Sequence, residues 1–346
     1  MLYVTNKETE MVEKNWNELI GEIEKTTLLE ERTIKYGEKV TSQPEHPFVD
    51  FPDPANRIIA LPAYVGGEVD VAGIKWIASF PDNINHGLAR ANSITILNST
   101  KTGIPFAIFN SPLLSIVRTS SVSGVVLKRF FEHRKGEKLN IGIIGFGPIA
   151  QTHYEMMCKL FKNQINEVKI YDLRKIDYEF KTGVKTSFVD SWKEAYDGAD
   201  VFLNATVTKE RYVEGKPKDE SLLLDVSLRD YKMEIYDHIK DGIIIDNWFQ
   251  VCRRNTDIEN FHNKFGLEEK DVYTIADVIH GNVFGKINTN CYFFSPFGLS
   301  TYDMAIGKYY YKKVKELGLG TMVEEPIEDE IVIENQKVMT MKKDLK

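Results

Sequence analysis

Residues 139–150 read LNIGIIGFGPIA, and this stretch decides the fold of a chain of 346 residues. It opens with a nearly continuous apolar run, which is typical of a strand covered on both faces. The run leads into Gly-x-Gly-x-x-Ala and then into QTHYEMMCKLF (151–161), which has helical character. This order predicts a dinucleotide-binding turn. Gly145 permits the tight turn, Gly147 lets the backbone approach a pyrophosphate, and Ala150 allows close packing of helix on strand.

Two features beside this turn bear on the cofactor. Pro148 and Ile149 open the helix, whose positive N-terminus suits a diphosphate. The next apolar run, EVKIYD (167–172), ends at Asp172. A carboxylate there accepts hydrogen bonds from a ribose 2′-hydroxyl and repels a 2′-phosphate, so NAD is favoured over NADP, although Arg174 softens the repulsion. The alternative for the glycines is an ordinary strand-to-helix turn.

Short apolar runs alternate with stretches of helical length through this part of the chain. The predicted strands are 139–145, 167–172, 184–190, 200–207, 221–228 and 242–248. Several of them are apolar almost throughout, as strands buried on both faces must be. Such alternation predicts an α/β fold with a Rossmann-type, doubly wound parallel sheet.

The flanking regions have a different pattern. Before residue 125, strand-like segments separated by Gly and Pro turns predict an antiparallel or mixed sheet, preceded by a helix around 6–37. After residue 297, a helix of four or five turns is predicted to end at Gly318. We therefore expect the Rossmann-type domain to be inserted into a second, α+β domain. The chain is thus predicted to have three parts. Residues 1–125 bind the substrate and form the dimer, residues 126–297 bind NAD, and residues 298–346 form a helix and tail that return to the first part.

Composition narrows the class of partner. The chain has 44 Lys and Arg against 51 Asp and Glu, a formal net charge of −7, so no global field attracts nucleic acid or an anionic membrane. Three scattered cysteines and seven histidines show no disulfide or metal-site spacing, and no metal is expected. The sequence has neither a signal-peptide pattern nor a membrane-spanning run. These features predict a cytoplasmic protein with a small-molecule partner, and a solvated acidic tail at 324–330.

Three cations lie in apolar surroundings outside the glycine turn. Arg57, Lys75 and Arg118 are each flanked by residues that favour burial, so each must reach solvent or be paired. Any one of them could be a structural cation, but three in one domain favour carboxylate binding. Asp230 follows the apolar run 221–228, at the strand edge where ligands bind in such sheets. It is a candidate acid or base, or a partner for an amine, with a helix N-cap as the alternative.

Taken in order, these pieces resemble the ornithine cyclodeaminase/mu-crystallin family. The matching segments are RIIALP (57–62), GIKW (73–76), the stretch 94–121, GFGPIA (145–150), Asp172, 227–230 and FSPFGLS (294–300). The resemblance implies a homodimer joined through the sheets of the non-Rossmann domains, with NAD and the active site between the two domains. It also implies that Arg57, Lys75 and Arg118 are the substrate-carboxylate and active-site cations and that Asp230 handles the substrate amine. Lys75 and Asp230 are the residues expected to be catalytic. We count Thr119, next to Arg118, among the cofactor-binding candidates.

The resemblance implies hydride transfer between an amino-acid Cα and nicotinamide, through an imine. Segments 62–79, 96–107 and 295–298 are most similar to the branch that forms 2,3-diaminopropionate for siderophores and peptide antibiotics. In that branch N-(2-amino-2-carboxyethyl)-L-glutamate is oxidatively hydrolysed to 2,3-diaminopropionate and 2-oxoglutarate. The alternatives are an ornithine or lysine cyclodeaminase, an alanine or imine dehydrogenase acting as a ketimine reductase, and a dinucleotide-binding protein without turnover.

Two departures from the family pattern concern the region after the fifth strand. The cyclodeaminase pattern Gly-Ala-Asp-x-Pro-Gly-Lys is absent, because Asp230 is followed by Tyr231, Lys232 and Met233. This departure argues against a proline-forming reaction. Arg229 is also unexpected beside Asp230, and we expect it to add a cation for a substrate with several carboxylates.

Overall fold

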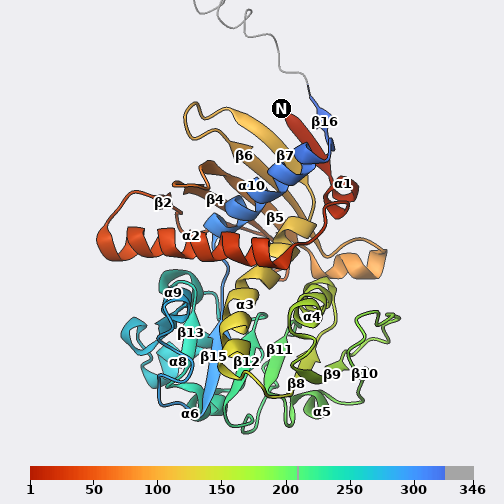
Figure 1. The fold of residues 1–346 in the computed structure, drawn as a ribbon, viewed down its shortest axis with the longest axis vertical. Helices are drawn as coiled ribbons and strands as arrows, with labels where there is room; N and C mark the ends of the chain where they lie inside the picture. The colour runs from red at the N-terminus through yellow and green to blue at the C-terminus, as the bar shows by residue number, and fades with distance from the viewer. Residues whose placement is uncertain (209, 324–346) are drawn as a thin grey trace, which may run out of the picture.

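Two eight-stranded sheets organise the molecule, and they lie at opposite ends of the view in Figure 1. The structure is a computed structural model and describes residues 1–208 and 210–323. The predicted acidic tail at 324–330 lies outside the described residues. None of the described helices is both long and apolar enough to cross a membrane.

The first of these sheets is wholly parallel and confirms the predicted fold class. Its order is β10 (Thr186–Phe188), β9 (Ile165–Tyr171), β8 (Leu139–Ile144), β11 (Val201–Asn204), β12 (Ser221–Asp225), β15 (Cys291–Ser295), β13 (Ile243–Ile245) and β14 (Tyr273–Thr274). The chain reverses its direction of travel across the sheet between β8 and β11. Ligands bind at such a switch point, outside the carboxyl ends of the strands.

All six strands predicted for this sheet are present, and two further strands complete it. β15 lies between β12 and β13, so all five of its residues are buried. The helices of the parallel-sheet domain are α4 (Pro148–Phe161), α5 (Trp192–Tyr196), α6 (Tyr236–Ile239), α7 (Trp248–Val251), α8 (Asp257–Phe265) and α9 (Ile275–Ile279), with 3-10 turns η2 (Met233–Ile235) and η3 (Glu269–Asp271).

The second sheet is mixed. Its order is β16 (Thr321–Met322), β1 (Leu2–Thr5), β7 (Pro105–Asn110), β6 (Ala91–Asn98), β5 (Val71–Ser79), β4 (Arg57–Val65) and β2 (Thr41–Ser42), with β3 (Phe48–Asp50) also paired to β4. β1 and β7 run parallel, and the other pairs are antiparallel. The short η1 (Pro81–His86) follows β5, and α1 (Asn6–Glu10) follows β1.

Three long helices connect the two sheets. α10 (Ser300–Glu316) packs on β4, β5 and β6, and α2 (Trp16–Tyr36) packs on α10. α3 (Leu113–His133) contacts α2, α4, α9 and α10, and in Figure 1 it runs from the mixed sheet down to the parallel one. One apolar core therefore continues from the mixed sheet through these helices to the parallel sheet.

Strands from both ends of the chain share the mixed sheet, so the parallel sheet is inserted between them. The predicted boundary at residue 125 falls inside α3, which continues unbroken to His133. We propose the division predicted from the sequence, with α3 as the connection that both domains use.

Candidate active site

The turn after β8 has the geometry that a dinucleotide needs. Gly145 has φ +78°, a conformation that only glycine adopts without strain, and a Cβ there would lie 2.6 Å from the Ala205 carbonyl oxygen. A Cβ at Gly147, by contrast, would meet nothing within 4 Å. Gly147 caps α4, which begins at Pro148 and continues through Ile149 to the buried Ala150. The open space at a helix N-terminus fits a pyrophosphate.

Asp172 lies beside this turn, at the end of β9. Its carboxylate accepts a hydrogen bond from the Phe146 backbone N–H at 2.7 Å, so it braces the turn directly. Arg174 donates to both carboxylate oxygens through Nε and Nη2, each at 3.0 Å. Burial opposes ionisation of Asp172, but these hydrogen bonds hold its pKa below the ordinary value. Asp172 is therefore an ionised carboxylate beside the turn, the group that a ribose 2′-hydroxyl needs, and the exposed Arg174 would give up one of its contacts to a bound ribose.

Lys75 and Arg118 meet at one carboxylate, that of Asp303 on α10. Lys75 Nζ lies 2.7 Å from Oδ2, and Arg118 Nε donates to Oδ1 at 2.8 Å. All three side chains are buried. Lys75 also donates to the Ser115 hydroxyl at 3.2 Å, and the Thr119 hydroxyl donates to the Ser115 carbonyl at 2.8 Å. The cluster of Lys75, Arg118 and Asp303, called here the buried triad, carries one net positive charge when Lys75 is protonated.

Burial and charge act against each other in the buried triad. Burial lowers the pKa of Lys75 to about 8, since the charge of Asp303 only partly offsets it and Arg118 adds to the lowering. Burial alone would raise the pKa of Asp303, but the charges and hydrogen bonds of Arg118 and Lys75 hold it below the ordinary value. Asp303 is thus an ionised carboxylate, while Lys75 has a pKa of about 8.

Asp230 follows β12 at the carboxyl edge of the parallel sheet and is only 1% exposed. Its carboxylate accepts hydrogen bonds from Thr206 at 2.8 Å, from Thr208 at 3.1 Å and from Ser227. A carboxylate has about four acceptor positions. Three hydroxyl donors therefore leave room for one more, as an amine of a bound molecule would supply.

The turn that carries Asp230 is strained and firmly held. Leu228 has φ +69°, which is unfavourable for a branched side chain. Its N–H donates to Asp225 at 2.9 Å, and its carbonyl accepts from Asp257 N–H at 2.8 Å. The Asp257 carboxylate in turn accepts from the N–H groups of Asp230 and Tyr231, both at 3.1 Å. Asp230 is accordingly positioned by its neighbours and does not cap a regular helix in the structure.

Arg57 and Arg229 lie apart from the buried triad and close to each other. Burial lowers the pKa of Arg57, and the charges of Arg229, Arg90 and Arg254 lower it further. Arg229 donates through Nε and Nη2 to the Arg254 carbonyl, at 3.1 and 2.9 Å. The predicted cations therefore form two groups, Lys75 with Arg118 and Arg57 with Arg229.

The chain is similar in sequence to a known protein family. A model of the ornithine cyclodeaminase/mu-crystallin family matches residues 3–318. The chain belongs to the ornithine cyclodeaminase/mu-crystallin family. Among its relatives in this family, N-((2S)-2-amino-2-carboxyethyl)-L-glutamate dehydrogenase of Staphylococcus aureus is 28% identical, over 77% of this chain and 82% of that protein. Alanine dehydrogenase of Archaeoglobus fulgidus is also 28% identical, over 76% of this chain and 82% of that protein.

Solved structures share the fold of this chain. Δ1-pyrroline-2-carboxylate reductase of Thermococcus litoralis, in complex with NADH and L-proline, superposes with a TM-score of 0.80 at 23% identity, covering 93% of this chain and all of that one. An archaeal alanine dehydrogenase dimer with bound NAD gives a TM-score of 0.77 at 23% identity, covering 94% and 99% of the two chains. Both confirm the predicted fold.

Two site residues of this family member escaped the sequence reasoning. Asp303 belongs to the helix predicted after residue 297, where an acidic residue between Tyr302 and Met304 was an available signal. His46 lies in the loop before β3, is 1% exposed, and has no hydrogen-bond partner for either ring nitrogen within the described residues. Burial, with the charge of Arg253 acting in the same direction, lowers its pKa to about 4. No sequence pattern marked it.

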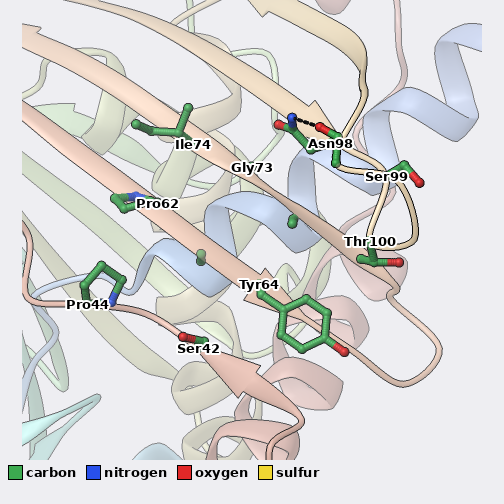
Figure 2. A pocket seen from close by; sticks show the side chains of 12 residues that line it. Ser42, Pro44, Pro62, Tyr64, Gly73, Ile74, Asn98, Ser99 and Thr100 are labelled. Carbon is green, nitrogen blue, oxygen red and sulfur yellow. Dashed lines mark hydrogen bonds between the residues drawn. The ribbon is translucent and has the colours of Figure 1, made fainter. Parts of the chain in front are cut away.

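A hollow on the mixed sheet lies away from these residues. Figure 2 shows it beside β4 and β5, where Pro62, Tyr64, Ile74 and Asn98 line it. No charged side chain is among its lining residues. Ile74 precedes Lys75 in β5, so its side chain points to the opposite face of the sheet from the buried triad. The hollow is therefore separate from the candidate active site.

Proposed function

We propose that this protein is an NAD-dependent oxidoreductase that oxidises the Cα–N bond of an amino acid through an imine. The observation that carries the proposal is the buried triad, which sets two cations beside the domain that has the dinucleotide turn. Relatives named as alanine dehydrogenase and as Δ1-pyrroline-2-carboxylate reductase support the same class of reaction. NAD, when bound, accepts a hydride from carbon.

Each group of the site has a task in such a reaction. Lys75 and Arg118 neutralise the substrate carboxylate and fix the orientation of the Cα–H bond, which removes much of the entropic cost of reaction. Asp230 holds the amine through its remaining acceptor position, so that the nitrogen lone pair can form the imine. Burial of all three groups keeps water away until the imine has formed.

We propose N-(2-amino-2-carboxyethyl)-L-glutamate as the substrate, in siderophore or peptide-antibiotic biosynthesis. The glutamate Cα gives up a hydride to NAD+ and the nitrogen loses a proton, forming an imine. Water then adds to the imine carbon and the C–N bond breaks, releasing 2,3-diaminopropionate and 2-oxoglutarate. Support comes from the Staphylococcus aureus relative and from Arg57 and Arg229, which provide cations for a substrate with several carboxylates.

Purified protein with NAD and a panel of amino acids tests this proposal. The panel contains the glutamate adduct, alanine, ornithine, lysine and proline, with NADH absorbance and product mass as readouts. We expect NADH, 2,3-diaminopropionate and 2-oxoglutarate in equal amounts from the adduct. Proline formed from ornithine would instead identify a cyclodeaminase, and turnover of alanine alone would identify an alanine dehydrogenase. Tight NADH binding without turnover of any compound would identify a binding protein.

We further propose that the protein is a homodimer joined through the mixed sheet. The face opposite α10 is apolar along three adjacent strands, with Ala60 opposite Trp76 and Trp76 opposite Ile94. Trp76 is 43% exposed and Ile94 is 40% exposed. An apolar patch of this kind on a sheet favours a protein interface. A cytoplasmic location, expected from the sequence, stays a prediction.

A further inference from the structure

Four arginines gather where the mixed sheet meets the parallel sheet. Arg57 opens β4 and Arg90 directly precedes β6. Ser79, which ends β5, pairs with Arg57 on one side and with Ala91 on the other. Arg57 and Arg90 therefore lie at the same end of the adjacent strands β4, β5 and β6.

Arg229 and Arg254 approach this edge from the parallel-sheet domain. The Arg254 guanidinium lies 4.1 Å from the Phe48 ring, and its Nη1 lies 3.8 Å from the Asp50 carboxylate. Asp50 pairs with Arg57 in the register of β3 and β4. Arg254 thus stands next to Arg57 across the domain boundary, with Arg229 bound to its carbonyl.

Arg57 and Arg90 have no counter-charge in the part of the chain that the structure describes. Neither makes an ion pair there, and the Nε atom of each is buried without a hydrogen-bond partner. Burial lowers the pKa of both guanidinium groups. Half-buried cations without partners cost free energy, and a bound anion reduces that cost. The guanidinium groups of Arg57 and Arg90 can therefore bind an anion with two or more oxygen acceptors.

The distance to the buried triad sets the shape of that anion. Lys75 lies four residues along β5 from Ser79, and both side chains point to the same face of the sheet. About 13 Å of strand separates the two positions, at about 3.3 Å per residue. This spacing suits one molecule that carries two carboxylates several bonds apart.

We propose that Arg57 and Arg90 form a subsite for a second carboxylate of the substrate, remote from the carboxylate held by Lys75 and Arg118. Arg90 is then a specificity residue that selects substrates with more than one carboxylate. This inference rests on the proposed function, and it adds a residue that neither the sequence motifs nor the buried triad include.

The first test compares Arg90→Gln with the unchanged protein in steady-state kinetics on the glutamate adduct. Loss of one charge-assisted contact is expected to raise KM about tenfold or more, with kcat within about twofold. Arg90→Lys, which keeps the charge but loses the fork, is expected to fall between the two. Arg129→Gln is the matched control, because Arg129 is partly buried but pairs with Glu24 at 3.1 Å. An unchanged KM in Arg90→Gln, or an equal rise in the control, overturns the subsite.

A second test needs no turnover. Binding of 2-oxoglutarate and of pyruvate to the protein with NADH is measured by calorimetry, since these keto acids differ in having two carboxylates or one. We expect 2-oxoglutarate to bind at least about tenfold more tightly, and Arg90→Gln to remove that preference while leaving pyruvate unchanged. Equal binding of the two by the unchanged protein overturns the subsite. Failure of the whole amino-acid panel, with the preference intact, overturns the proposed function alone.

Discussion

Asp303 and Lys75 form a buried ion pair in which Nζ lies 2.7 Å from Oδ2, although 228 residues separate them in the chain. The other oxygen of Asp303 accepts from Arg118. One carboxylate on α10 thereby fixes a strand residue and a helix residue in the same place. Removing the Asp303 carboxylate leaves two buried cations without a counter-charge. This costs more stability than replacing the whole cluster by apolar side chains.

Asp303→Asn is therefore expected to destabilise the protein by about 3–5 kcal/mol. Denaturant unfolding at neutral pH measures this loss. Asp82→Asn is a suitable control, because Asp82 is exposed and its carboxylate bonds to Asn85 and His86 of its own turn. A change in Asp303→Asn no larger than that of the control contradicts the prediction.

Lys75 gives the reaction a pH dependence. With a pKa of about 8, its ammonium group is present below pH 8 and is lost as the pH rises above it. If the charge holds the substrate carboxylate, kcat/KM falls tenfold per pH unit above pH 8. Lys75→Arg keeps the charge, so the fall should disappear even if the maximum rate drops. A rate that instead rises through pH 8 would show that Lys75 acts as a neutral base.

Asp230→Asn tests the amine partner. The substitution keeps the size of the side chain and removes its charge, so kcat is expected to fall by about 10²–10⁴. The fold should survive, because the turn is held by Asp225 and Asp257 through the backbone. A near-ultraviolet spectrum and NADH titration check that survival. Retention of more than about a tenth of kcat would assign the amine to another group.

His153 makes stability fall in mild acid. It lies between α3 and α4, with Nδ1 2.8 Å from the Ile149 carbonyl and Nε2 2.9 Å from the Ser123 hydroxyl. Burial lowers its pKa from 6.5 to about 4. The folded state stays neutral while the unfolded state binds a proton, so stability is complete above pH 6.5 and is lost as the pH falls toward 4. By this linkage we expect a loss of about 2 kcal/mol between pH 7.5 and pH 5.

Unfolding free energies at those two pH values, for the unchanged protein and for His153→Gln, measure this term. The variant is less stable at pH 7.5, but its loss on going to pH 5 should be smaller by about 2 kcal/mol. His86→Gln serves as the control, since His86 is exposed. Equal slopes in all three proteins would contradict the assignment.

Trp76→Glu tests the dimer face. A charge in the middle of the apolar sheet face should shift the mass in analytical ultracentrifugation from two chains to one. The side chain is 43% exposed in the single chain, so folding should be little affected. Phe249→Glu, on α7 of the parallel-sheet domain, is the control: Phe249 is 74% exposed, so this variant should leave the dimer intact. A dimer that persists in Trp76→Glu would place the interface elsewhere.

The sequence by itself determined the parallel sheet and its glycine turn. Strands such as 139–145 are apolar on both faces, and the turn at Gly145 depends on neighbours only a few residues away. Local patterns of this kind are readable because backbone conformation and strand burial leave a short-range imprint on residue type. For the same reason the sequence found Lys75 and Arg118 as cations in apolar surroundings.

Only the tertiary structure decided what those cations meet. Asp303 reaches them because α10, from the end of the chain, returns across β4, β5 and β6. In the same way, β15 lies between β12 and β13 although it follows both in the chain, because packing and not chain order sets the order of the strands. Arg90 and His46 have ordinary sequence neighbours, and their importance rests on the absence of partners inside the described fold. A missing partner is a property of three-dimensional packing, which no short-range pattern records.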